Sequence, residues 1–194
     1  MRISIRGTSG SGKSTVGKAA AGRLGIPYVE LDAIRHGPNW TEMPDEEFVE
    51  RVRAVVAGDA WIVDGNYGAV RAVTGERATQ VVWLDLPRWL TMWQVFRRSV
   101  ARAALRRELW SGNRESFRSW ADPTHPIRWA WSTHARRRRD FEAAMRGDPR
   151  WVRLRSRREV NRWLAGLGSE PGSGGRQPAT SRRGFRTTGA SRGR

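Results

Sequence analysis

The feature that most restricts the fold of this chain is a nine-residue segment near its start, Gly7-Thr8-Ser9-Gly10-Ser11-Gly12-Lys13-Ser14-Thr15. It fits the pattern G-x-x-x-x-G-K-[ST], in which glycines let backbone N–H groups approach phosphate oxygens closely. A short β-branched run over residues 2–6 precedes it, and a helical pattern from Ser14 to Leu24 follows it. A helix that starts there directs the positive end of its dipole at a bound anion. The segment therefore predicts a phosphate-binding loop (P-loop).

Two side chains of this loop predict its ligand. Lys13 is expected to place a positive charge between the β- and γ-phosphates of a nucleoside triphosphate, and the Ser14 hydroxyl is expected to bind Mg²⁺. The backbone of residues 7–15 would hold the phosphates themselves. ATP and Mg²⁺ are therefore the expected cofactors.

Strands and helices alternate along residues 1–167, which is the pattern of a doubly wound parallel sheet. The apolar runs are continuous, as is typical of strands that are buried on both faces. We expect strands at residues 2–6, 28–31, 61–63, 81–84 and 151–154, and helices at 14–24, 44–57, 87–109, 127–145 and 156–167. The sequence thus predicts one three-layer α/β domain, with a polar loop over residues 110–126.

The net charge of +17 is unevenly distributed along the chain. Residues 1–87 hold 10 basic and 11 acidic side chains, whereas residues 88–165 hold 20 and 7. Residues 168–194 are rich in Gly, Ser and Arg and contain one aromatic residue, Phe185, so we expect a disordered basic tail. A positive field attracts polyanions, which makes nucleic acid a candidate partner of the basic half and tail.

The composition also excludes some classes of site. The chain has no cysteine, so it forms no disulfide and no thiolate metal site. Neither a signal-peptide pattern nor a run of about 18 apolar residues is visible. We therefore expect a cytoplasmic protein without a membrane partner.

Three aspartates follow predicted buried strands, at the edge of the sheet where the phosphates would lie. Asp64 is a candidate ligand of Mg²⁺ or of its waters. Asp32 is a candidate for binding the hydroxyl of a phosphate acceptor or for acting as its base. Asp85 precedes Leu86 and Pro87 and is expected to order that turn or to reach the nucleotide. For each of them, capping of the following helix is the alternative role.

Arginines are the candidate cations for the transferred phosphate. Arg97 and Arg98 lie on the predicted helix 87–109, and residues 136–139 are a run of four arginines on the predicted helix 127–145. The guanidinium fork suits phosphoryl oxygens, so one or two of these side chains are expected to act in catalysis. A solvated basic surface is the alternative.

The motifs together resemble the adenylate-kinase-like P-loop kinases, and most closely the bacterial group called DNA topology modulation proteins. The segments that carry this resemblance cover residues 1–166 and are Gly7–Thr15, Leu31-Asp32, Asp64-Gly65-Asn66-Tyr67, Val82–Pro87, Arg97-Arg98 and Val152–Ser156. The resemblance implies a small-molecule kinase fold with a lid at about residues 109–126. It also implies that Asp64 occupies the place of the carboxylate in the Asp-Gly-Phe-Pro-Arg segment of adenylate kinases. This chain has Asn66-Tyr67-Gly68 in place of Phe-Pro-Arg, so it lacks the arginine that those kinases use on the monophosphate.

The sequence favours phosphate transfer from ATP–Mg²⁺ to a small acceptor bound near Asp32, with Lys13, Asp64, Arg97 and Arg98 as catalytic residues. Two alternatives remain open. The chain could bind nucleic acid under the control of an ATP switch, which the basic half and tail suggest. It could also hydrolyse ATP with water and use no acceptor.

Overall fold

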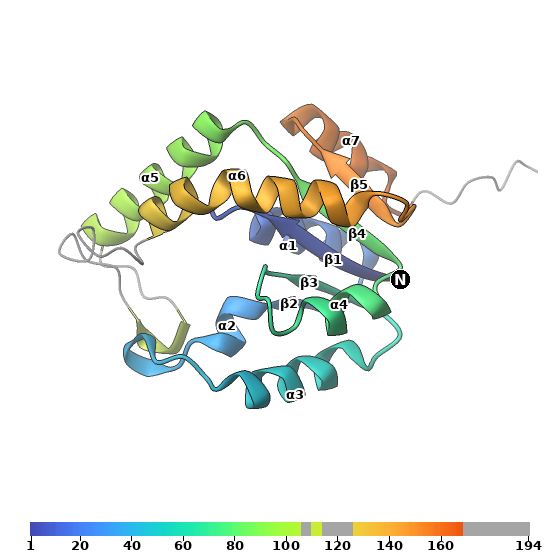
Figure 1. Ribbon diagram of the computed structural model, residues 1–194, viewed down its shortest axis with the longest axis horizontal. Helices are drawn as coiled ribbons and strands as arrows, with labels where there is room; N and C mark the ends of the chain where they lie inside the picture. The colour runs from blue at the N-terminus through green and yellow to red at the C-terminus, as the bar shows by residue number, and fades with distance from the viewer. Residues whose placement is uncertain (106–109, 114–125, 169–194) are drawn as a thin grey trace, which may run out of the picture.

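The computed structural model describes residues 1–105, 110–113 and 126–168 of the chain (Figure 1). Five strands form one sheet in the order β2-β3-β1-β4-β5, and every neighbouring pair is parallel. The strands are β1 (Arg2–Gly7), β2 (Tyr28–Glu30), β3 (Trp61–Asp64), β4 (Gln80–Leu84) and β5 (Trp151–Leu154). The predicted doubly wound parallel sheet is confirmed.

The longer helices lie close to the predicted ranges: α1 (Lys13–Leu24), α3 (Asp45–Val56), α5 (Arg88–Ala104), α6 (Pro126–Met145) and α7 (Arg157–Gly166). Two short helices, α2 (Leu31–Arg35) and α4 (Arg71–Arg77), were not expected from the pattern. Each is too short to show the 3.6-residue period over two full repeats. Two 3₁₀ turns complete the described elements, η1 (Pro38–Trp40) and η2 (Trp110–Gly112).

The sheet lies between two helical layers, because side chains along each strand alternate between its faces. On one face, Ile3 and Ile5 pack with the apolar sides of α1 and α7. On the other face, Trp61 and Val63 pack with Phe48 and its neighbours on α3. Helix α6 crosses in front of the sheet on this second side (Figure 1), where Phe141 contacts the rings of two tryptophans on β4 and β5.

One residue of the central strand departs from the apolar pattern of the core. Arg6 on β1 is charged, yet it is only 3% exposed and is nearly as buried as the apolar residues Ile3 and Ile5 of the same strand. Its guanidinium lies on the α4 and α6 side of the sheet, where Nη2 donates to Thr74 Oγ1 at 2.7 Å. A buried charge in a central strand is costly unless it is paired.

Two predicted segments fall largely outside the described residues. Of the predicted lid (about 109–126), only residues 110–113 and 126 are described, and of the predicted tail (168–194), only Gly168 is. The predicted boundary between domain and tail at residue 167 therefore stays a prediction. Within the three described ranges, no helix is both long enough and apolar enough to cross a membrane.

Candidate active site

The P-loop leaves β1 at the carboxyl edge of the sheet and leads directly into α1. Gly12 caps α1 in the left-handed region, with φ 88°, and so allows the chain to turn from the loop into the helix. The loop is closed by a hydrogen bond from the Ser11 amide to the Thr8 carbonyl oxygen at 3.0 Å. Lys13 Nζ donates to the same oxygen at 3.2 Å. The loop and the start of the helix thus surround a single position suited to an anion.

Burial lowers the pKa of Lys13, and the nearby charges of Asp64 and Asp32 oppose this effect. These two carboxylates are the ones expected at the site from the sequence. The structure therefore places Lys13, Asp32 and Asp64 near one another, at one edge of the sheet.

The P-loop is packed tightly against α5. A Cβ at Gly10 would lie 2.2 Å from Val95 Cγ2 and 2.8 Å from the Thr91 carbonyl oxygen, so only glycine fits there. The Gln94 amide, oriented to satisfy its neighbours, donates to Gly10 O at 2.7 Å and accepts from Arg157 Nη2 at 3.2 Å. Helix α5 thus links the phosphate loop to the beginning of α7.

Because of this packing, replacing Gly10 and replacing Gly22 by alanine should have different effects on stability. Gly10→Ala is expected to lower the free energy of unfolding by about 1–3 kcal/mol, because the added methyl group overlaps Val95 and because alanine rarely adopts the φ of +81° found at Gly10. Gly22→Ala is the matched control: Gly22 lies within α1 with no atom within 4 Å of its added Cβ, so stability should rise by up to about 1 kcal/mol. Urea denaturation measures both. Equal effects would show that α5 does not restrain the loop.

Four oxygen-bearing side chains meet beside Lys13, where β2 and β3 end. Ser14 Oγ donates to Glu30 Oε1 at 2.8 Å, and Tyr28 Oη donates to Asp64 Oδ2 at 2.7 Å. Glu30 and Asp64 are direct partners in the β2–β3 register. Hard oxygen donors of this kind suit Mg²⁺, which takes one or two carboxylates and completes its shell with phosphates and water. The donor set therefore fits the expected ion.

The electrostatics of this group follow from burial. Burial raises the pKa of Asp64, and the charge of Lys13 and the hydrogen bond from Tyr28 partly offset the increase. Burial and the neighbouring Asp64 also raise the pKa of Tyr28, so its phenol stays protonated and remains a donor. Within the described ranges, His, Asp and Glu do not gather in threes as a metal site built from protein ligands alone would require, so phosphate oxygens would have to contribute.

Asp32 occupies a different local structure from the predicted one. The sequence predicts a strand to residue 31 with Asp32 at its end, but β2 stops at Glu30 and Asp32 lies in the first turn of α2. The edge strand stops there because its partner β3 also ends, at Asp64. Asp32 still faces the site: its Oδ1 accepts from Tyr67 Oη at 2.7 Å, and this hydroxyl lies 3.2 Å from His36 Nε2.

The side of the site around Asp32 is supported by Arg35. This guanidinium forms ion pairs with Glu42 at 2.9 Å and Asp45 at 2.6 Å. It also lies 5.2 Å from the ring centre of Phe48 and 5.9 Å from that of Tyr67. Arg35 therefore orients the ring that holds Asp32, while its own charge is already matched by two carboxylates.

The candidate arginines divide clearly. Arg98 Nη2 donates to Ser9 Oγ at 3.2 Å and so reaches the P-loop, whereas Arg97 is exposed on another face of α5. Of the arginine run on α6, Arg137 is half-buried; burial and the charges of Arg136 and Arg71 lower its pKa, and Asp32 and Tyr67 oppose this effect. Of the candidate arginines in the described ranges, Arg98 and Arg137 are thus the ones that lie near the site.

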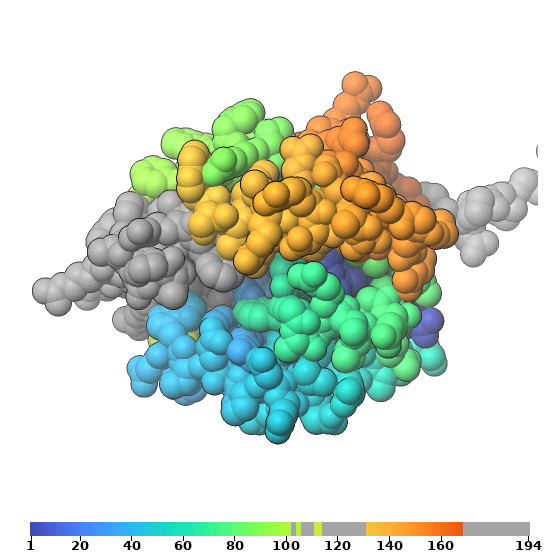
Figure 2. Space-filling view, viewed as in Figure 1, coloured from blue at the N-terminus to red at the C-terminus, as the bar shows by residue number. Residues whose placement is uncertain are grey.

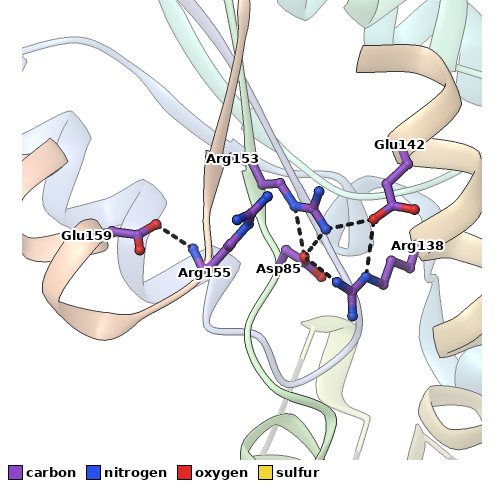
Figure 3. Close-up of polar contacts among 6 residues, drawn as sticks. All are labelled: Asp85, Arg138, Glu142, Arg153, Arg155 and Glu159. Atoms are coloured by element: carbon purple, nitrogen blue, oxygen red, sulfur yellow. Dashed lines mark hydrogen bonds and ion pairs between the residues drawn. The ribbon is translucent and has the colours of Figure 1, made fainter. Parts of the chain in front are cut away.

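Asp85 belongs to an ion-pair network and not to the P-loop (Figure 3). Its Oδ2 accepts from Arg153 Nε and Nη2 at 2.9 and 2.5 Å, and Arg153 also binds Glu142 at 2.8 Å. Arg138 lies 3.6 Å from the same Asp85 oxygen. Arg153 and Asp85 come from the sheet side, whereas Arg138 and Glu142 come from α6. The network therefore fixes α6 to the sheet, and with it the adjacent Arg137.

The segment that follows α5 contacts the loop after α2. Asn113 is buried, accepts from the Trp40 amide at 2.9 Å and donates to the Gly37 carbonyl oxygen at 2.9 Å. Ser111 Oγ donates to the His36 carbonyl oxygen at 2.9 Å. Residues 36–41 are thus held by the start of the predicted lid.

Glu30 was not singled out from the sequence, and Asn66 and Arg137 were named there only as members of a longer segment. Glu30 precedes Leu31-Asp32 in sequence, so its place at a strand end could have been noticed. Asn66 lies within the Asp-Gly-Asn-Tyr segment, and its side-chain amide both accepts from and donates to the backbone of Gly7. Arg137 carried no distinguishing signal among four consecutive arginines.

The fold and the P-loop together define a class: this chain has the fold of the P-loop kinases. It is similar to a gluconokinase from Sinorhizobium meliloti 1021, with a TM-score of 0.50 at 21% identity over 86% of this chain and 92% of the other. It is also similar to the shikimate kinase of Bacteroides thetaiotaomicron, with a TM-score of 0.51 at 15% identity over 86% of this chain and 95% of the other. The shikimate kinase of Acinetobacter baumannii, in complex with shikimate, matches with a TM-score of 0.52 at 15% identity over 86% of this chain and 89% of the other.

Sequence comparison adds no closer assignment. No family model and no curated protein matches the chain. At these identities the similarity to known structures establishes the fold alone.

Proposed function

We propose that this protein transfers the γ-phosphate of ATP–Mg²⁺ to a hydroxyl or phosphate group of a small molecule bound near Asp32. The observation that carries the proposal is that Asp32, which accepts a hydrogen bond from Tyr67, lies close enough to the P-loop for its charge to act on Lys13. The fold, which is that of kinases with small-molecule acceptors, supports it.

In this proposal each part of the site has one role. The P-loop backbone and Lys13 hold the phosphates, and Arg98, which contacts Ser9, neutralises charge at the same loop. Ser14, Asp64 and Glu30 would hold Mg²⁺, which supplies further charge neutralisation when bound. Catalysis then depends on positioning and on fixed charges rather than on covalent chemistry by the protein.

The acceptor would lie between α2 and α6. Asp32 and Tyr67 offer a carboxylate and a phenol to a hydroxyl group, and Arg137 offers a positive charge across from them. Arg137 would suit an acceptor that itself carries an anionic group. We further infer that Arg97, being exposed, contributes little to catalysis. The Asp-Gly-Asn-Tyr and Trp-Leu-Asp-Leu-Pro segments support a resemblance of the chain to the DNA topology modulation group.

Phosphate transfer to a panel of acceptors tests the proposal. The panel holds nucleosides, nucleoside monophosphates and hydroxylated acids, gluconate and shikimate among them, with hydrolysis by water as the baseline. One acceptor that clearly outpaces water would support a kinase. If no acceptor exceeds water, hydrolysis without an acceptor or an ATP switch that acts on nucleic acid becomes the better interpretation.

Asp32→Asn is expected to raise the KM for the acceptor roughly tenfold, because a charge-assisted hydrogen bond to the acceptor hydroxyl is lost. Hydrolysis of ATP by water should not change, since Asp32 does not contact the P-loop phosphates in this proposal. Asp59→Asn, an exposed aspartate before β3, is the matched control. Initial rates against acceptor concentration measure the effect. An unchanged KM would remove Asp32 from the acceptor site.

A further inference from the structure

Arg6 carries a buried charge that its described surroundings do not balance. Its Nη2 donates to two neutral oxygens, Thr74 Oγ1 at 2.7 Å and the Arg71 carbonyl at 3.5 Å. Its Nη1 is buried and has no hydrogen-bond partner. Among the described residues, no carboxylate pairs with this guanidinium. Burial and the positive charge of Arg71 lower the pKa of Arg6 to about 10.

The guanidinium lies on the wall of a cavity between α4 and α6. The cavity measures about 260 Å³, far more than the roughly 30 Å³ that one water occupies in the liquid. In the space-filling view, dark blue atoms of the N-terminal part of the chain are visible between α4 and α6 (Figure 2). The cavity therefore reaches the central strand.

The lining of this α4/α6 cavity combines basic and aromatic side chains. Arg6, Arg71 and Arg150 contribute positive charge, and Phe141 and Trp151 contribute rings. Two carboxylates also line it, Asp148 and Glu76.

The charge of Asp148 is already neutralised by Arg150. Arg150 binds it with Nε at 2.9 Å and Nη2 at 2.8 Å, and the remaining Arg150 Nη1 donates to the carbonyl oxygens of Gly75 and Ala78. Arg6 and Arg71 thus remain as two positive charges against one carboxylate, Glu76.

We propose that the α4/α6 cavity binds a small oxyanion, a phosphate or carboxylate group, at Arg6 and Arg71. Such a group would balance the buried charge of Arg6, which lines the cavity, and the guanidinium fork matches the geometry of both groups. The volume suits a small molecule that carries this group, with its apolar part against Phe141 and Trp151.

Among the described residues that line the α4/α6 cavity, none belongs to Gly7–Thr15. Arg6 directly precedes Gly7, but its guanidinium lies on the α4 and α6 side of the sheet, and Asp148, Arg150 and Trp151 line the cavity from the amino end of β5. An anion bound at Arg6 and Arg71 would therefore not need a nucleotide in the P-loop.

Calorimetric titration of the full chain with inorganic phosphate, and separately with acetate at matched ionic strength, tests the proposal. Lys13→Ala, which alters the P-loop, should retain phosphate or acetate binding at the cavity. Arg6→Met, added to Lys13→Ala, should weaken that binding at least tenfold. The tighter of the two anions identifies the class of ligand. Loss of all anion binding in Lys13→Ala, or unchanged binding after Arg6→Met, would overturn the proposal.

A second pair of variants leaves the buried arginine in place. Ala72→Glu adds a carboxylate to the cavity wall from an exposed position on α4, and it should weaken anion binding at least tenfold by competition. Ala54→Glu adds the same charge to an exposed position on α3 and should have no such effect. Equal weakening by both variants would mean that only net charge matters, and the site would be rejected.

Discussion

Lys13→Ala is expected to reduce phosphate transfer from ATP by about 10²–10³-fold, measured as kcat/KM for ATP. Lys13 is a half-buried residue of the P-loop, and its Nζ already contacts the Thr8 carbonyl oxygen. Its ammonium is the single lysine charge available to the β- and γ-phosphates, because the chain has only one other lysine, Lys18.

That other lysine supplies the control. Lys18 is exposed on α1, so Lys18→Ala should leave transfer within about twofold of the wild type, as is usual for surface substitutions. Thermal unfolding of both variants shows whether the fold is kept. A folded Lys13→Ala protein with wild-type transfer would refute the assignment of this loop to catalysis.

Asp64→Asn is expected to reduce Mg²⁺-dependent transfer by about 10²-fold and to raise the Mg²⁺ concentration needed for half-maximal rate. The pH profile separates a metal ligand from a structural group. Burial raises the pKa of Asp64, so its carboxylate takes up a proton at a higher pH than an exposed aspartate does. Transfer by the wild type should therefore fall as the pH falls through that raised pKa, and Asp64→Asn should lack this acid limb.

Tyr28→Phe is the variant matched to Asp64→Asn, and it should shift the acid limb of the pH profile in a defined direction. The hydrogen bond from Tyr28 lowers the pKa of Asp64, so its removal should raise that pKa further and move the acid limb to higher pH. The carboxylate itself remains, so the rate at alkaline pH should stay near that of the wild type. An acid limb that is the same in all three proteins would exclude Asp64 as its origin.

The parts of the site that the sequence predicted are those encoded by short, contiguous signals. Gly7–Thr15 combines residue identity, spacing and the change from strand to helix within one segment, and Asp64 directly follows a buried apolar run. The five strands were recognisable for the same reason. Local patterns of this kind keep their meaning whatever the remainder of the chain does.

The parts that were missed depend on tertiary packing. Arg137 is one of four consecutive arginines, and only the anchoring of α6 by Asp85 and Arg153 decides which of them faces Asp32. Asp85 itself was ambiguous, because its partner Arg153 lies 68 residues away in sequence. Asp32 was expected directly after a strand that ends at residue 31, whereas β2 ends at Glu30, because the pairing that ends β2 is set by the length of β3.

Asn66 has a consequence for how the phosphate loop is held before any ligand arrives. The pairing of β1 with β3 ends at Ile5 and Asp64, yet the Asn66 side-chain amide offers Gly7 both an acceptor and a donor, as a peptide group of a longer strand would. Asn66 thereby extends the hydrogen bonding between β1 and β3 by one residue pair, through a side chain. Aspartate could supply only the acceptor, and would add a negative charge beside the phosphates. Gly7, the first residue of the loop, is therefore held on one side by β4 and on the other by Asn66, which follows β3. The glycines after it belong to a loop whose starting point is fixed.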